Sequence, residues 1–119
     1  MDEKLRQERR RAIAVVNRLR QQFAYYFDKI KSNAGIRELF PRTYEELITS
    51  VRQTGLDREP TPINENTPAS HLQELLHSYE KFNNDLVDAV RSEKHDHHGL
   101  HLILEELIRA LRWLIDYSE

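Results

Sequence analysis

The spacing of apolar residues most constrains the fold of this chain, because it repeats at helical pitch in four segments. The first segment extends from about Glu3 to Asn33 and carries two rows of residues seven positions apart. These rows are Leu5, Ala12, Leu19 and Tyr26, and Arg9, Val16, Phe23 and Ile30. Both rows lie on one face of a helix. Since no strand-like alternation competes with this pattern, the sequence predicts an all-α protein.

Residues that commonly begin or end helices divide the first half of the chain. We expect Gly35 to end the first helix in the left-handed conformation. Thr43 and Glu46 have the spacing of a capping box, in which Thr43 begins a short helix that Gly55 closes. Residues 36–40 form either one turn of helix or an extended link between these two helices.

The second half of the chain predicts two further helices and a loop before them. One helix begins at Thr67 or Ser70 and extends to about Glu93. Another extends from Leu100 to Tyr117 and is the most apolar. Residues 56–69 contain three prolines and no helical period, which indicates a loop that crosses the length of the bundle. The sequence therefore predicts a single domain over residues 1–119. This domain is a bundle of three long helices and one short helix, with a long Pro-containing loop between helices two and three.

Composition excludes several functional classes. The chain has no cysteine, which excludes disulfides, thiolate catalysis and cysteine-based zinc sites. It also has no Gly-rich phosphate loop and no nucleophile elbow, so we expect no cofactor and no enzyme activity. The first residues lack an apolar signal segment, and no apolar run approaches the roughly 20 residues that span a bilayer. We therefore expect a cytoplasmic protein that does not enter a membrane.

Charge is distributed unevenly along the chain. Residues 1–52 contain 12 Lys and Arg against 7 Asp and Glu, which gives +5, whereas residues 53–119 contain 6 against 13, which gives −7. The first predicted helix is longer than the second and fourth. We therefore expect its first turns, within residues 1–12, to overhang the bundle and to present a basic surface to an acidic partner.

The favoured function is binding of another macromolecule, as a regulator, adaptor, inhibitor or small subunit of an assembly. The residues expected to contact the partner are Arg6, Arg9, Arg10, Arg11, Tyr25 and Trp113. We also expect a homodimer formed through the first and last helices. An alternative is binding of nucleic acid through the basic region from Arg6 to Arg20, whose positive field neutralises phosphates.

Four of the six histidines lie within residues 95–101, which suggests a metal site as one alternative. On a helix, His97 and His101 stand four residues apart on one face, and Glu105 continues the row. Two neutral imidazoles and a carboxylate so placed suit Zn²⁺. Glu74 and His77 have the spacing of carboxylate–metal sites in helical bundles, but they lie off the apolar stripe and we expect them in solvent.

Two short resemblances suggest phosphate chemistry in the same region. The run His95-Asp-His-His98-Gly99 resembles the His-x-x-Lys-Gly motif of histidine phosphotransfer domains, with His98 where that family has lysine. This resemblance implies that His95 accepts phosphate and that Gly99 clears space for the donor. Arg91 and His97 enclose five residues, a spacing similar to that of HEPN-type helical ribonucleases. That resemblance implies that both side chains converge on a scissile phosphate, usually across a dimer.

The favoured interpretation of residues 92–99 is a polar bend between two antiparallel helices. A His-dependent enzyme or phosphocarrier that uses Arg91, His95, His97 and His98 stays open as the alternative. In either case we expect the imidazoles to make this end of the bundle sensitive to pH between about 5 and 7.

Overall fold

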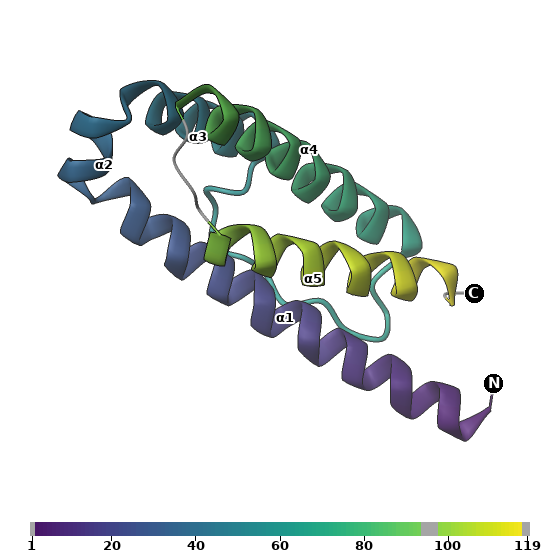
Figure 1. Cartoon of the computed structure of the whole chain (residues 1–119). Coiled ribbons are helices and arrows are strands. Elements are labelled where there is room, and N and C mark those ends of the chain that lie inside the picture. Colours follow the sequence, from purple (N-terminus) through teal and green to yellow (C-terminus); the bar gives the residue numbers. More distant parts are fainter. Residues whose placement is uncertain (1, 94–97, 118–119) are drawn as a thin grey trace.

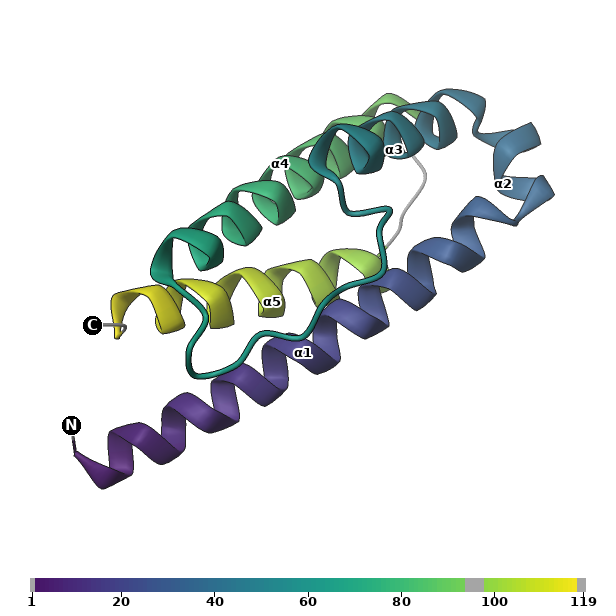
Figure 2. The same ribbon diagram turned by 180° about the vertical axis from the view of Figure 1, so that it is seen from behind.

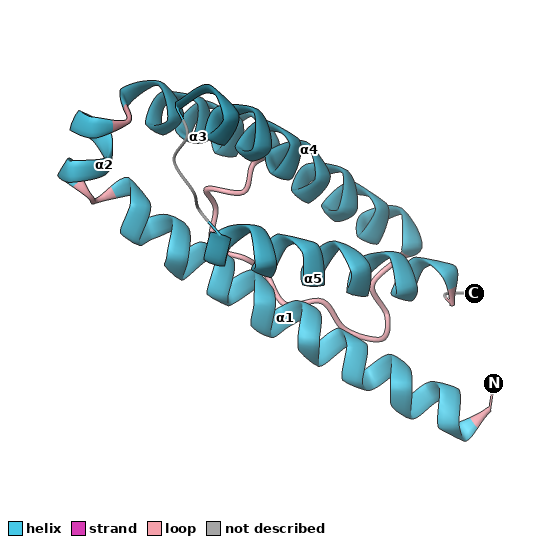
Figure 3. Ribbon diagram, in the orientation of Figure 1, coloured by secondary structure: helices cyan, strands magenta, loops and turns pink. Residues whose placement is uncertain are grey.

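The computed structural model describes residues 2–93 and 98–117, and this part of the chain contains five helices and no strand (Figure 3). The helices are α1 (Glu3–Lys31), α2 (Ala34–Leu39), α3 (Pro41–Thr54), α4 (Ala69–Glu93) and α5 (His98–Asp116). The prediction of an all-α protein is confirmed. The structure differs from the predicted four helices by α2, a helix of 6 residues that joins α1 to α3 (Figure 1).

The helices pack in the order α1, α5, α4 and α3, so that α5 lies between α1 and α4, and α3 lies against α4. Helices α1 and α4 run in one direction and α5 runs in the other (Figures 1 and 2). In both views the first turns of α1 extend beyond the start of α4. The inward face of these turns therefore has no α4 opposite it.

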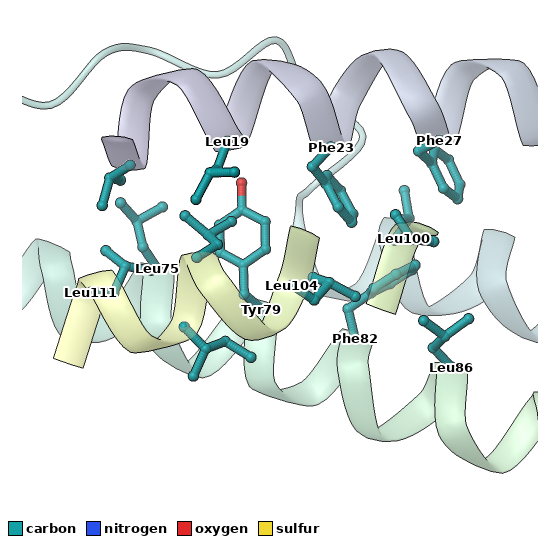
Figure 4. Close-up of a cluster of buried hydrophobic side chains, with 14 of the residues drawn as sticks. Leu19, Phe23, Phe27, Leu75, Tyr79, Phe82, Leu86, Leu100, Leu104 and Leu111 are labelled. Atoms are coloured by element: carbon teal, nitrogen blue, oxygen red, sulfur yellow. The ribbon is translucent and has the colours of Figure 1, made fainter. Parts of the chain in front are cut away.

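The core lies where α1, α4 and α5 face one another (Figure 4). Phe23 of α1 meets Tyr79 and Phe82 of α4 edge to face, with ring centroids 5.4 and 5.2 Å apart. Such pairs add geometric preference to the apolar burial. From α5, Leu104 and Leu111 fill the remaining space and are fully buried. Although α5 is the most apolar helix, none of the described helices has both the length and the apolarity to cross a membrane.

The junction between α1 and α2 differs from the prediction. Gly35 lies inside α2, whose first turn is capped by the Asn33 side chain accepting a hydrogen bond from the Ile36 N–H. Gly55 is the only glycine with positive φ among the described residues, at 73°, and it ends α3 as predicted. Because Asn33 caps a new helix directly after α1, Gly35 lies within that helix and does not form the predicted left-handed turn.

The predicted capping box at Thr43 is wrong. Helix α3 begins two residues earlier, at Pro41, which suits the first helical position because proline lacks the N–H that would stay unpaired there. Thr43 instead lies inside the helix, fully buried, and its hydroxyl donates to the carbonyl of Ala89 on α4. A buried hydroxyl needs such an acceptor, so Thr43 stabilises packing of α3 on α4.

A crossover loop, residues 55–68, connects α3 to α4 and runs along α1 (Figure 2). The Asn17 side chain donates to the Ile63 carbonyl at 3.0 Å and accepts from the Ile63 N–H at 2.9 Å. Arg20 donates to the Thr61 carbonyl at 2.7 Å. The loop is therefore fastened to α1 by side chains that satisfy its backbone groups, as a partly buried loop requires.

Candidate partner-binding surface

The four arginines predicted to meet a partner have different surroundings. Arg10 is an exposed residue whose Nε lies 2.6 Å from the Glu65 carboxylate of the crossover loop. Arg9 is half-buried, and its Nη1 donates to the carbonyl of Tyr117 at 3.1 Å. Arg6 and Arg11 are exposed. Arg6 stands only at the edge of ion-pair distance from a carboxylate one turn earlier, and Arg11 has no ion-pair partner among the described residues.

Arg9 lies beside an aromatic pair at the end of α5. The rings of Trp113 and Tyr117 are 4.8 Å apart at an interplanar angle of 32°. Trp113 is half-buried against the core, and Tyr117 is 48% exposed. Leu5 lies one turn before Arg9 on the same side of α1 and is also half-buried. We call the surface formed by Leu5, Arg9, Trp113 and Tyr117 the terminal patch.

Two predicted contact residues lie away from the terminal patch. Arg11 follows Arg9 by two positions, which places it on the opposite side of α1, about 200° around the helix. Tyr25 lies in the second half of α1, where it is 64% exposed and has the Lys29 ammonium 4.6 Å from its ring centre. The structure therefore brings Arg9 and the Trp113–Tyr117 pair together and separates Arg11 and Tyr25 from them.

The histidine-rich stretch is only partly described. His95 and His97 lie outside the described residues, as does the side chain of His98, and Arg91 is exposed near the end of α4. The predicted row of His101 and Glu105 exists, with His101 Nε2 and a Glu105 carboxylate oxygen 3.0 Å apart. The other ring nitrogen of His101, Nδ1, lies 3.1 Å from an amide oxygen on α4. Both ring nitrogens are therefore already in contact with oxygen atoms.

The described residues contain no cluster of three or more side chains arranged to hold a metal ion. Glu74 and His77 are both exposed, as expected from their positions off the apolar stripe. The Glu74 carboxylate lies 3.7 Å from the ring of His71, one turn earlier on α4. At the surface, Glu74 therefore pairs with His71 and not with His77, the histidine that the spacing had suggested.

A buried polar contact joins α3 to α4 and was not predicted from the sequence. Ser50 is 2% exposed, and its hydroxyl donates to one carboxylate oxygen of Asp85 at 2.7 Å. The Lys81 ammonium donates to the same oxygen at 2.9 Å. Burial alone would raise the pKa of Asp85, but the hydrogen bonds from Ser50 and Lys81 outweigh it and hold that pKa below its ordinary value. The contact links α3 to α4, and Ser50 and Lys81 donate to the same oxygen of Asp85.

We also did not predict from the sequence that Arg20 is buried. Arg20 is 7% exposed, although its type and position placed it with the basic surface of the first helix. A signal for its burial exists, because Arg20 stands seven residues after Ile13 and seven before Phe27, in a row whose other members belong to the core. With Arg20 buried and Arg10 paired, two cations are removed from the basic surface that was expected to meet nucleic acid.

No protein-family model, curated protein or solved structure matches this chain.

Proposed function

We propose that this chain is a small interaction protein that binds another protein through the terminal patch. The observation that carries the proposal is the contact of Arg9 with the Tyr117 carbonyl beside the Trp113–Tyr117 pair. It brings an arginine from the first turns of α1 next to two aromatic residues at the end of α5. No α4 lies opposite these turns of α1. Arginine, tryptophan and tyrosine are the residue types that contribute most binding free energy at protein interfaces.

The chemistry of the patch favours a partner that presents acidic and apolar groups together. The Arg9 guanidinium makes one hydrogen bond among the described residues, so its other N–H groups are available to bind a partner carboxylate. Leu5 and Tyr117 offer apolar surface beside it. A second copy of this chain also fits this chemistry, because residues 53–119 carry a net charge of −7. Self-association through α1 and α5 is therefore one form of the same proposal.

The test compares charge reversal on the two sides of α1. Arg9→Glu places a carboxylate in the terminal patch, and Arg11→Glu makes the same change of charge on the opposite side. Each variant and the unchanged protein serve as immobilised bait for extracts of the native host, and retained proteins are quantified by mass spectrometry. We expect a partner that the unchanged protein and Arg11→Glu retain and that Arg9→Glu and Trp113→Ala lose.

Light scattering on the same proteins tests the self-association form. A dimer that Arg9→Glu dissociates and Arg11→Glu preserves would identify the partner as a second copy. If Arg9→Glu and Trp113→Ala retain the same proteins as the unchanged chain and the same mass in solution, the terminal patch is not the binding surface. Thermal unfolding of each variant confirms that lost binding does not reflect lost folding.

A further inference from the structure

Arg20 is a buried cation without an anionic partner in the described part of the chain. Its Nε donates to the Tyr79 hydroxyl at 3.4 Å, and its Nη1 donates to the Thr61 carbonyl at 2.7 Å. Both acceptors are neutral. A guanidinium has five N–H groups, so three of them lack an acceptor among the described residues. Buried charges are ordinarily paired, because removing a charge from water without an opposite charge is costly.

The Tyr79 hydroxyl is a second buried donor at the same place. Tyr79 is 2% exposed, and its oxygen accepts from Arg20, but its own proton has no acceptor among the described residues. Burial raises the pKa of Tyr79, and the hydrogen bond and charge of Arg20 only partly oppose that rise. The hydroxyl therefore keeps its proton at neutral pH and remains able to donate. Figure 4 shows it pointing from α4 toward α1.

A cavity of about 380 Å³ lies next to these two donors, between α1, the end of α3, the crossover loop and α4. Its walls are apolar where Phe23, Leu75 and Pro60 line it, and cationic where Arg20 and Arg58 line it. Its lining combines apolar with many polar and charged side chains, and its volume lies within the range of sites for small molecules.

Acidic groups are also present at the cavity but do not neutralise Arg20. Glu59 and Glu74 are among the lining residues, and both are exposed. Neither lies within ion-pair distance of Arg20, and Glu74 contacts His71 instead. The buried end of the cavity therefore stays cationic.

We propose that this cavity binds a small organic anion whose carboxylate or phosphate group is held by Arg20 and Tyr79. The planar guanidinium matches two oxygens of such a group at once, and the Tyr79 hydroxyl supplies a further donor. The apolar wall at Phe23 and Leu75 holds the body of the ligand. A purely structural arginine would leave these donors unused, whereas an anion satisfies them. This site is separate from the terminal patch, and each proposal stands without the other.

The crossover loop forms part of the site, because Thr61 holds Arg20 and Pro60 lines the cavity. A bound anion neutralises the charge below the loop and adds contacts to it. We therefore expect the amide hydrogens of residues 55–68 to exchange more slowly with solvent when the anion is bound.

The experiment uses the full chain and NMR of the Arg20 Nε–H, with four probes at equal ionic strength. Sodium benzoate and phenyl phosphate carry an apolar body and differ in the anionic group. Inorganic phosphate lacks the body, and benzamide lacks the charge. We expect benzoate or phenyl phosphate to shift the Arg20 signal saturably, with a dissociation constant below about 1 mM, and benzamide to leave it unchanged.

Variants connect the shift to the two donors. Tyr79→Phe keeps the ring and removes the hydroxyl, and we expect it to weaken binding about tenfold, whereas the exposed control Tyr25→Phe leaves it unchanged. Arg20→Met removes the charge together with the Arg20 signal, so its binding is followed by the amide hydrogen exchange of residues 55–68, which the anion should no longer slow. Arg18→Met makes the same substitution at an exposed position of α1 and serves as its control. Should Arg20→Met fail to fold, the Tyr79→Phe comparison decides the question alone.

The outcomes separate the possible ligands. Binding of benzoate, of phenyl phosphate or of both supports the site and identifies the anionic group that it accepts. Binding of inorganic phosphate alone overturns the organic-anion assignment. The absence of any saturable shift, or equal binding of benzoate and benzamide, overturns the site itself.

Discussion

Arg10 and Arg20 lie ten residues apart on α1, and both are held by the crossover loop, but their surroundings differ. Arg10 is exposed and meets the Glu65 carboxylate, so its charge is balanced at the surface. Arg20 is buried and meets only a carbonyl and a hydroxyl. The charge of Arg10 is therefore balanced by the loop and needs no ligand. The loop and α4 leave N–H groups of Arg20 without an acceptor among the described residues.

The difference also separates two kinds of contribution to stability. An exposed ion pair contributes little, because water screens both charges and two long side chains must be ordered. The loop is instead fastened by Asn17, whose amide satisfies both backbone groups of Ile63, a residue that is 4% exposed. We therefore expect the stability of the loop to depend on Asn17 and the ligand chemistry to depend on Arg20.

The largest expected effect comes from Asn17→Ala. This change leaves the N–H and the carbonyl of Ile63 without their partners in a partly buried place, and each lost partner costs on the order of 1 kcal/mol. We expect the free energy of unfolding to fall by about 2 kcal/mol, as measured by urea denaturation. Hydrogen exchange should show faster opening of residues 55–68.

Gln21→Ala is the matched control, because Gln21 is exposed on the same helix and is replaced by the same residue. It should leave both the unfolding free energy and the exchange of the loop unchanged. An equal loss in both variants would mean that the substitution acts through the helix and not through the contact with the loop.

A smaller effect is expected from Tyr79→Phe, measured as a function of pH. Because burial raises the pKa of Tyr79 in the folded protein, the unfolded chain loses this proton first as pH rises. The contribution to stability is fully present below about pH 10, the ordinary value for tyrosine, and is lost above it. We therefore expect the unfolding free energy of the unchanged protein to fall more steeply above pH 10 than that of Tyr79→Phe.

Chemical denaturation between pH 8 and 11 provides the measurement, with Tyr25→Phe as the exposed control. At neutral pH, Tyr79→Phe removes the acceptor of Arg20 and should cost about 1 kcal/mol. Parallel curves for Tyr79→Phe and the unchanged protein above pH 10 would show that the hydroxyl is not held in its protonated form, and would weaken the contrast between Arg20 and Arg10.

Helical periodicity predicted most of the fold, since the core rows of the long helices depend only on local spacing. It failed where the outcome depended on contacts between distant residues. Thr43 has the spacing of a cap but lies inside α3, because the Ala89 carbonyl on α4 accepts a hydrogen bond from its hydroxyl. Gly35 was expected to break the chain, but Asn33 caps a new helix around it. Both positions allow two local structures, and packing selects one.

The candidate sites were less predictable than the fold for the same reason. Composition identified the basic first turns, but it gave no sign that Arg9 would meet Tyr117 or that Arg10 would meet Glu65, which are separated from them by 108 and 55 residues. Arg20 was hidden among surface arginines. Only its place in the row of core residues marked it, and that row does not reveal whether a neutral or an anionic group faces the buried charge.

The smallest expected effect, and the one that best sharpens the comparison, is that of Glu65→Gln. The hydrogen bond and charge of Arg10 lower the pKa of Glu65, so the pair contributes above the ordinary pKa of a glutamate and its contribution is lost as pH falls through the lowered value. Because both side chains are exposed, water and salt screen that contribution. We expect thermal unfolding at pH 7 to be unchanged within error in 0.15 M salt. The exchange of residues 55–68 should likewise match that of the unchanged protein. If Glu65→Gln lowered the stability as much as Asn17→Ala, the assignment of loop stability to Asn17 would be contradicted. The exposed Arg10–Glu65 pair, and not the Asn17 amide, would then fasten the loop next to Arg20.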